Sequence, residues 1–251
     1  MAADPLRGAW LAHRLHPARV LVLPRVRSTN LVAAEHLEAG NLRPPAIVSA
    51  SRQTAGRGQR ENRWWSDGGS LCATLLLPVE PDQPVGAAPL RAGLAVASVL
   101  ATRLPGCRVQ VKWPNDILVG YKKIAGLLCA RLRDTDLIGI GLNVFTDLRA
   151  APQEISSRAT TLLRAGAKRL KRDELLAEIW CAVKAERSDG SWIDRYNEVH
   201  LLHLQPIRLE RPGGPMIGVC RGVDEQGRLL LETSDGMRRI TEGTPGRMPL
   251  R

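Results

Sequence analysis

The sequence predicts an α+β protein, a mixed sheet with helices that is followed by a small β-domain. Apolar runs of strand length alternate with helical segments as far as about residue 203. One of these helices, residues 89–104, is apolar on every side and is therefore expected to be buried. After His203 the pattern changes to four or five short strands separated by Gly-containing turns, which is typical of a small barrel or sandwich.

The first helix expected near the sheet covers residues 31–37, and Gly40 would end it. Ser28, Thr29 and Asn30 precede it, and residues of this kind cap helix N-termini through their side-chain oxygens. Hydroxyls and free N–H groups at a helix start also bind polar or anionic ligand groups. Capping and ligand binding are compatible, so both interpretations stay open.

Two strands, residues 46–50 and 71–77, enclose a loop that runs from Gln53 to Trp65. The loop alternates arginine and glycine with polar residues. A helix or strand made from it could not bury any face without leaving charged groups unpaired. Glycine lets backbone N–H groups approach a ligand, and the arginine fork matches carboxylate and phosphate oxygens. A charged surface turn is the alternative, but two tryptophans at the end of the loop favour a site that closes to water. The residues concerned are Gly56, Arg57, Gly58, Arg60, Arg63, Trp64 and Trp65.

Strands are also expected after the buried helix. Residues 108–113 alternate polar and apolar and break at Pro114-Asn115-Asp116. Residues 117–119 and 123–129 are typical of a hairpin that turns at Gly120. The strand 137–144 contains two glycines, which would let a ligand or a neighbouring chain come close.

The C-terminal third is expected to hold helices and then strands. The helices are predicted at 160–165, at 173–187 with Asp173 as the N-cap, and at 191–197. The strands are predicted at 207–209, 216–219, 229–232 and 237–240.

The formal net charge of +11 and the isoelectric point of about 10.2 favour anionic partners. Most of the basic residues are arginines, and only residues 164–172 form a dense basic run, so nucleic-acid binding is not expected as the main role. Residues 1–24 are too short for a helix-turn-helix module, and no specific DNA binding is expected.

The five cysteines are odd in number and never spaced as CxxC, which argues against a disulfide framework or a zinc site. A reducing cytoplasm is therefore the expected location. The most apolar window, residues 92–101, is about half as long as a membrane span requires, and no membrane association is expected.

Taken in order, these motifs resemble biotin protein ligases over roughly residues 25–145. The motifs are Ser28-Thr29-Asn30, Gln53-Thr54-Ala55-Gly56-Arg57-Gly58, Trp64, Lys112-Trp113-Pro114-Asn115-Asp116, Lys123-Ile124-Ala125-Gly126 and Gly139-Ile140-Gly141-Leu142-Asn143. The resemblance implies a catalytic domain with a class II tRNA synthetase-like fold over residues 1–203 and a small SH3-like β-barrel over residues 204–251. It also implies a two-step reaction, in which biotin and ATP give biotinyl-5′-AMP and pyrophosphate, and a lysine of a biotin carboxyl carrier protein domain then accepts the biotinyl group. A homodimer is an open possibility.

The resemblance also implies residue roles. Biotin would be bound by Ser28, Thr29, Asn30, Gln53, Gly56, Arg57, Gly58, Gln59, Lys123 and Gly126. ATP would be bound by Arg60, Trp64, Lys112, Asn115, Asp116 and Asn143. Arg57 and Lys123 are the catalytic candidates, because a carboxylate that attacks a phosphate brings two anions together and cations must offset their repulsion. Mg²⁺ is expected with ATP, although no carboxylate cluster marks its ligands.

Some alternatives remain. Asn115 and Asp116 would also suit an Asx turn after a proline, and Lys123 would also suit a solvated hairpin, although Lys122 is the better candidate for facing solvent. Many relatives carry arginine, glycine and arginine where this loop has Gln59, Glu61 and Asn62, so retention of the adenylate would either be weaker or rely on Arg60 and Arg63. Residues 247–251 are expected near the nucleotide.

The nearest enzymatic rivals are lipoate ligases and octanoyl transferases, which look similar in fold and also transfer an acyl group to lysine. The Gly-Arg-Gly loop with Trp64 and the run from Lys112 to Asp116 favour biotin. A ligand-sensing repressor would need a DNA-reading module besides this catalytic domain.

Overall fold

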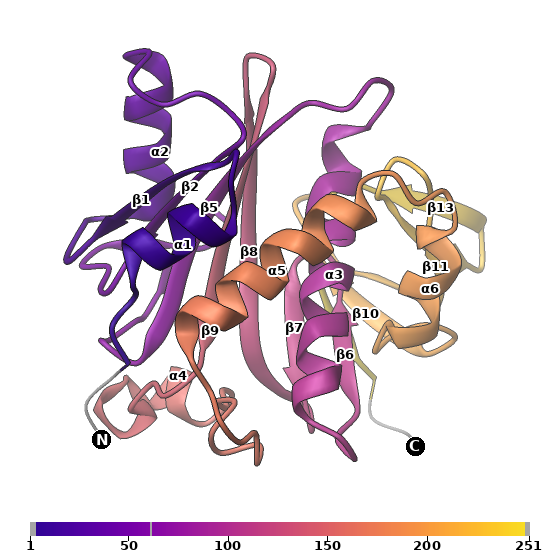
Figure 1. Ribbon diagram of the computed structural model, residues 1–251. Helices are drawn as coiled ribbons and strands as arrows, with labels where there is room; N and C mark the ends of the chain where they lie inside the picture. Colours follow the sequence, from indigo (N-terminus) through magenta and orange to yellow (C-terminus); the bar gives the residue numbers. More distant parts are fainter. Residues whose placement is uncertain (1–3, 61, 249–251) are drawn as a thin grey trace.

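A computed structural model describes residues 4–60 and 62–248. Its main feature is a seven-stranded sheet with the order β1-β2-β5-β9-β8-β7-β6 (Figure 1). The strands are β1 (Arg19–Leu23), β2 (Ala46–Ala50), β5 (Ser70–Pro78), β6 (Val109–Lys112), β7 (Asp116–Val119), β8 (Lys122–Leu132) and β9 (Thr135–Asn143). β1 and β2 are parallel and the other neighbours are antiparallel, so the sheet is mixed, as predicted.

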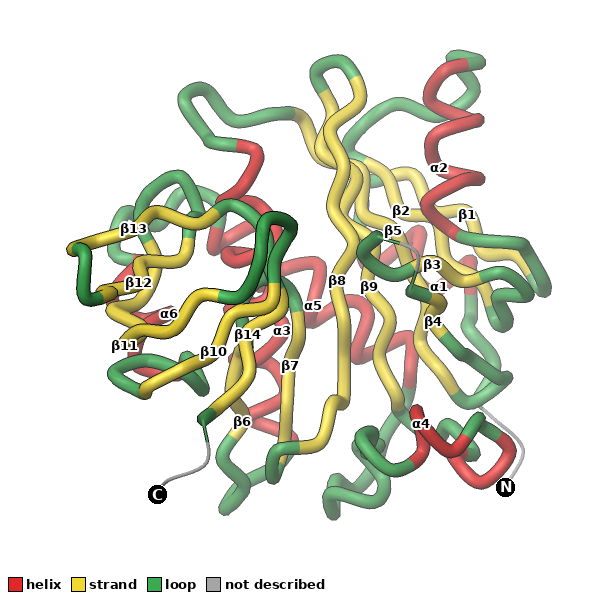
Figure 2. Tube along the Cα trace, turned by 180° about the vertical axis from the view of Figure 1, so that it is seen from behind, coloured by secondary structure: helices red, strands yellow, loops and turns green. Residues whose placement is uncertain are grey.

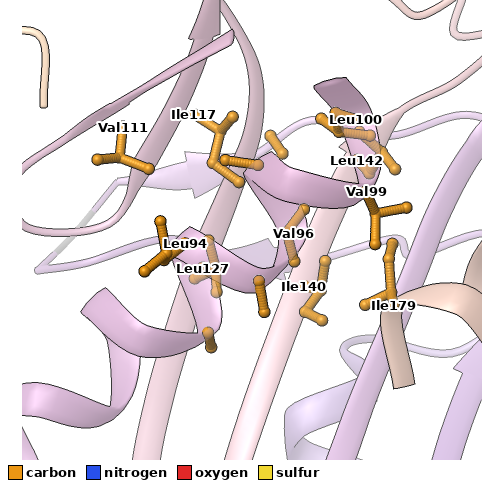
Figure 3. Packing of buried hydrophobic residues seen from close by; sticks show 14 of the residues in the cluster. Leu94, Val96, Val99, Leu100, Val111, Ile117, Leu127, Ile140, Leu142 and Ile179 are labelled. Carbon is orange, nitrogen blue, oxygen red and sulfur yellow. The ribbon is translucent and has the colours of Figure 1, made fainter. Parts of the chain in front are cut away.

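Two long helices, α3 (Ala88–Arg103) and α5 (Arg172–Glu186), cover one face of this sheet (Figure 1). Leucine, valine and isoleucine side chains of α3, α5 and the sheet meet in the main core (Figure 3). Within the described residues, one helical segment, Val85–Arg103, is long and apolar enough to cross a membrane by length and composition, and most of it is buried. Because it packs against both α5 and the sheet, it is a core helix of this fold.

The opposite face of the sheet is covered differently. Helix α2 (Thr29–Glu38) packs there through Ala33 against Val48, Leu76 and Leu137, which form a second, smaller core. Alternate residues of a strand point to opposite faces, so these side chains are separate from the α3 side. The two-stranded hairpin of β3 (Gly56–Arg57) and β4 (Arg63–Trp64) lies over β8 and β9 on this face (Figure 2).

The second sheet follows α6 (Trp192–Val199). It has five antiparallel strands in the order β13-β12-β11-β10-β14. They are β10 (Pro206–Glu210), β11 (Met216–Val223), β12 (Leu229–Thr233), β13 (Gly236–Ile240) and β14 (Thr244–Arg247). The predicted small β-domain is confirmed, but among the described residues no pairing joins β13 to β14, so the sheet does not close into a barrel.

Three expectations about local structure were wrong. Residues 160–165 form no helix: residues 162–165 form a turn, and Leu162 N–H donates to the Asn143 carbonyl, so tertiary pairing overrides helix propensity. Asp173 is not the N-cap of α5, since the helix begins at Arg172 and the Asp173 carboxylate pairs with Arg7. The edge strand β1 was missed, since no strand was predicted among residues 1–24; helix α1 (Gly8–Arg14) precedes it.

The remaining short elements are the single-turn helix α4 (Gln153–Ser156) and the 3₁₀ turns η1 (Val85–Ala87) and η2 (Leu148–Ala150). A boundary between domains at residues 203 and 204 remains a prediction.

Candidate functional site

A cavity of about 410 Å³ opens on the sheet face opposite α3 and α5. Its walls come from the start of α2, the β3–β4 loop, the turn between β6 and β7, strands β8 and β9, and the start of β14. Fifteen of the sixteen residues predicted to bind biotin or ATP line it; these are Ser28, Thr29, Asn30, Gln53, Arg57, Gly58, Gln59, Arg60, Trp64, Lys112, Asn115, Asp116, Lys123, Gly126 and Asn143.

Gly56 is the exception, because it does not line the cavity. It is buried, and a Cβ at this position would collide with the backbone oxygen of Trp64 and lie 3.0 Å from Gln53 Nε2. The glycine therefore allows the two strands of the hairpin to approach. A contact of Gly56 with biotin stays a prediction.

At the start of α2, Ser28 occupies the N-cap position but makes no capping hydrogen bond with its side chain. The Thr29 N–H donates to Gln53 Oε1 at 2.7 Å, and the Thr29 hydroxyl donates to the same oxygen at 3.1 Å. Gln53 thus supplies the acceptor for this helix start, and the buried Ser28 side chain lines the cavity instead.

Asn30 is held by both of its polar atoms. Its Nδ2 donates to the Leu128 carbonyl at 2.9 Å, and its Oδ1 accepts from the Thr74 hydroxyl at 2.6 Å. A Cβ at Gly139 would collide with this amide. The glycine in β9 therefore receives a side chain of the protein, which fixes the amide beside the cavity.

Trp64 uses the second glycine of β9 in the same way. Its indole lies so close to Gly141 that a Cβ there would collide with the ring. Lys123 Nζ lies 5.7 Å from the ring centroid of Trp64, within the range of a cation–π contact. Trp64 thus forms a flat wall beside the lysine.

Lys123 and Asp116 form an ion pair with 2.5 Å between Nζ and Oδ1. Lys123 is half-buried whereas Lys122 is exposed, so the predicted assignment of the two lysines is confirmed. Burial lowers the pKa of the neighbouring Lys112, and the Asp116 charge opposes that shift. Two ammonium groups therefore lie near one carboxylate in this wall.

The turn between β6 and β7 is fixed by bonds to distant elements rather than by an Asx turn. Asn115 Nδ2 donates to the Leu127 carbonyl of β8 at 2.6 Å. Trp113 N–H donates to His200 Nε2 at 3.2 Å, and Trp113 Nε1 donates to the Gly227 carbonyl at 3.0 Å. The buried ring of Trp113 therefore ties the turn to the second sheet.

Asn143 closes the far end of the cavity, where its Nδ2 donates to the Thr160 carbonyl at 3.1 Å. Sequence reasoning missed several cavity residues near it and on β14, including Glu154, Arg158, Gly243 and Thr244. Arg158 reaches the cavity because Ala159 bridges to Lys123, and Thr244 because β14 pairs with β10. Both depend on long-range backbone pairing, for which the local sequence holds no signal.

Charge in the cavity is strongly one-sided. Six cationic side chains and two carboxylates line it; they are Arg57, Arg60, Arg63, Lys112, Lys123 and Arg158, with Asp116 and Glu154. Within the described residues, the Arg57 and Arg63 side chains have no ion pair. Unpaired guanidinium groups beside a cavity favour a polyanionic ligand such as a triphosphate.

Residues 22–147 match the biotin/lipoate A/B protein ligase family, and residues 205–244 match the biotin protein ligase C terminal domain. The chain belongs to the biotin/lipoate A/B protein ligase family. The first match lies on the seven-stranded sheet and the second on the five-stranded sheet. This agrees with the predicted resemblance.

Individual similar proteins show which members of the family this ligase resembles. It is 30% identical to the biotin–[acetyl-CoA-carboxylase] ligase of Mycobacterium tuberculosis, with 91% of this chain and 87% of the relative covered. It is also 30% identical to the bifunctional ligase/repressor BirA of Bacillus subtilis, with 88% and 71% covered. The structure of the Aquifex aeolicus biotin protein ligase in complex with biotin and ATP superposes with a TM-score of 0.78 and 27% identity, covering 92% of this chain and 99% of that one.

Proposed function

We propose that this ligase activates biotin with ATP and then transfers the biotinyl group to a lysine of a biotin carboxyl carrier protein domain. The observation that carries the proposal is the convergence of Arg57 and Lys123, from separate segments, on one cation-rich cavity. The printed names of the relatives and the biotin–ATP complex of the Aquifex aeolicus enzyme support the same substrates.

In the first step the biotin carboxylate oxygen attacks the α-phosphorus of ATP. The bond between that phosphorus and its bridging oxygen breaks, and pyrophosphate leaves. Arg57 and Lys123 both line the cavity, and their charges would offset the repulsion of the two anions and the charge that grows at phosphorus. In the second step the carrier's lysine amine attacks the acyl carbon and AMP leaves; Asp116 is the candidate acceptor for the amine's proton.

The proposed biotin half consists of Ser28, Thr29, Asn30, Gln53, Arg57, Gly58, Gln59, Lys123 and Gly126. Hydroxyls and amides offer paired donors and acceptors for a ureido ring, and Leu128 supplies apolar surface for the thiophane and tail. Gly126 leaves room for Lys123, whose Nζ would lie 3.0 Å from a Cβ at that position.

The proposed nucleotide half consists of Arg60, Trp64, Lys112, Asn115, Asp116 and Asn143. Asn115 and Asn143 each give their amide nitrogen to the protein, which leaves their Oδ1 atoms as acceptors for a ligand. Mg²⁺ would arrive on the ATP phosphates, since the described part of the chain has no cluster of three or more His, Cys, Asp or Glu that could hold a metal. Residues 249–251, also expected near the nucleotide, lie outside the described residues, as does Glu61 of the loop.

The wider proposal covers location and assembly. The five cysteines, all within the described residues, are free, which supports a reducing cytoplasm. The match of residues 205–244 to a separate family domain supports a boundary near residues 203 and 204. A possible homodimer and the expected lack of specific DNA binding are addressed by gel filtration and by a salt-dependent gel shift.

Trapping the activated acyl group tests the function. The protein is incubated with ATP labelled at the α-phosphate and with biotin or lipoate, and the acyl-adenylate is then chased with carrier domain. We expect an adenylate with biotin and none with lipoate. Equal adenylate from lipoate would instead favour the lipoate or octanoyl branch of the family.

The Arg57→Ala variant tests the role of Arg57 in the same assay. The variant is expected to release free biotinyl-adenylate or to form none, because a cation that meets both anions is lost. Arg52→Ala, an exposed arginine that does not line the cavity, serves as the matched control. Unchanged biotinylation of the carrier by Arg57→Ala would rule out the role of Arg57.

A further inference from the structure

The tip of the β3–β4 loop is joined to the second sheet by one hydrogen bond. Arg60 Nη1 donates to Thr244 Oγ1 at 2.9 Å, across 184 positions of the sequence. The loop is otherwise closed by its own backbone, with Gly58 N–H donating to the Asn62 carbonyl at 2.7 Å and Asn62 N–H to the Gln59 carbonyl at 3.2 Å. Among the described residues of this tip, Arg60 alone makes a side-chain hydrogen bond outside the loop.

Thr244 lies on a strand that is paired with its neighbour. It opens β14 and pairs with Glu210 of β10, and the next pair joins Pro245 to the fully buried Leu209. Gly243, Thr244 and Pro245 also line the cavity. The hydrogen bond to Thr244 therefore joins the tip of a short hairpin loop to a paired strand, and Arg60 and Thr244 both line the cavity.

The backbone conformation of Arg60 also favours this hydrogen bond. Its φ of 58° lies in the left-handed region, which disfavours a residue with a Cβ. Such a conformation persists where the surroundings over-determine it, and it directs this side chain toward β14. Asn or Gly would fit this backbone more easily, but neither reaches a strand across the cavity mouth.

We infer that Arg60 and Thr244 form a latch that holds the β3–β4 loop over the cavity and so retains the acyl-adenylate until the carrier arrives. The inference rests on the proposed function. Thr244 is a positioning residue, since it acts through the loop and not on the reacting atoms. A single exposed hydrogen bond is weak enough to break when the carrier binds. While it is formed, the Arg60 guanidinium keeps further N–H donors for a nucleotide.

Thr244→Val removes the acceptor while keeping the β-branched shape, and Thr244→Ser keeps the hydroxyl. With Thr244→Val we expect adenylate to leave the protein about 3- to 10-fold faster, as the loss of one charge-assisted hydrogen bond predicts. Thr244→Ser should retain adenylate like the wild type. The readout is the half-life of protein-bound labelled adenylate after dilution into unlabelled biotin and ATP, and thermal unfolding checks that all variants fold alike.

A double-mutant cycle with Arg60→Met isolates the pair. If the latch exists, Thr244→Val adds little to the faster release that Arg60→Met already causes. Equal half-lives for wild type and Thr244→Val, or fully additive effects in the cycle, would overturn the latch. Failure of the wild type to form any adenylate would instead overturn the proposed function, so the two outcomes are distinguishable.

Discussion

At the scale of single residues, Lys122 and Lys123 are adjacent in sequence but differ in surroundings. Lys123 pairs with Asp116 and lies over Trp64, whereas Lys122 is exposed. We expect Lys123→Ala to slow adenylation by about 100- to 1,000-fold, because a cation at the developing phosphorane charge is lost. Its effect on the dissociation constant for biotin should be much smaller. Pyrophosphate exchange and isothermal titration measure the two quantities.

Lys122→Ala is the matched control for that experiment and should behave like the wild type in both assays. Equal losses in adenylation rate and in biotin affinity for Lys123→Ala would assign Lys123 to ground-state binding.

The buried histidine His200 makes the stability of the folded protein depend on pH. Burial lowers its pKa to about 3, with Lys112 and His203 adding to the shift. The unfolded chain takes up a proton near pH 6.5 that the folded protein excludes, so stability is full above about pH 6.5 and falls as the pH drops toward 3. The expected slope is about 1.4 kcal/mol for each pH unit.

Urea unfolding at pH 7.5 and pH 5.0 checks this expectation. His200→Gln keeps a hydrogen-bond acceptor for Trp113 but cannot titrate, so it should lose much less stability between these two pH values than the wild type. An identical loss in both proteins would show that other groups, not His200, set the acid sensitivity.

Residue types in the site were predictable because each carries its chemistry in the sequence. Arg57, Gly58 and Arg60 in the loop, and the polar triplet at the start of α2, are out of place in a core, and they line the cavity. Gly56 does not line the cavity, and a glycine that admits a ligand and one that admits a neighbouring strand look alike in sequence. The same reasoning failed for Arg158 and Thr244, which reach the cavity through backbone pairing between distant segments.

At the scale of elements, strand β9 receives the side chains of two other segments on its glycines. A Cβ at Gly141 would collide with the Trp64 indole. We expect Gly141→Ala to destabilise the protein by about 1–3 kcal/mol through overpacking and to weaken ATP binding by displacing Trp64. Thermal unfolding and ATP titration are the measurements.

Gly190→Ala is the control, because a Cβ at that exposed glycine would meet nothing within 4 Å. An unchanged ATP affinity in Gly141→Ala would mean that Trp64 does not form a wall of the nucleotide site. A loss of stability in both variants would point to a general cost of replacing glycine.

Elements were predicted well where hydrophobic period and burial agree, as in α3, β5 and β9. The predicted helix at 160–165 failed because Thr160 and Leu162 donate their N–H groups to Lys123 and Asn143, a choice that only the assembled sheet offers. The hairpin of β3 and β4 has only two residues in each strand, too few to show a period.

At the scale of the whole molecule, Arg187 joins the end of α5 to the sheet. It is 5% exposed, pairs with the equally buried Asp136 at 3.2 Å, and donates to the Pro78 carbonyl. We expect Arg187→Met to cost about 3–5 kcal/mol, because Asp136 loses one of its two cationic partners inside the protein. Arg149→Met, at an exposed ion pair, should cause no measurable change in urea unfolding. Equal effects of both substitutions would contradict the distinction.

The relation between the two sheets was beyond what the sequence alone predicts. The β-domain was expected from turn spacing, yet nothing in its sequence shows that Gly227 would accept from Trp113 or that Thr244 would border the cavity. Side chains of both sheets share one hydrophobic core, and Thr244 and Pro245 of the second sheet form part of the site's walls.

In the proposed reaction Arg57 and Lys123 act together on one phosphoryl group. A crystal structure of the protein with biotin and a non-hydrolysable ATP analogue would show whether they do. We expect the α-phosphate to lie within hydrogen-bond distance of both the Arg57 guanidinium and Lys123 Nζ, with the biotin carboxylate beside it. An α-phosphate bound outside this cavity, or an Arg57 that points to solvent with both ligands in place, would contradict the claim.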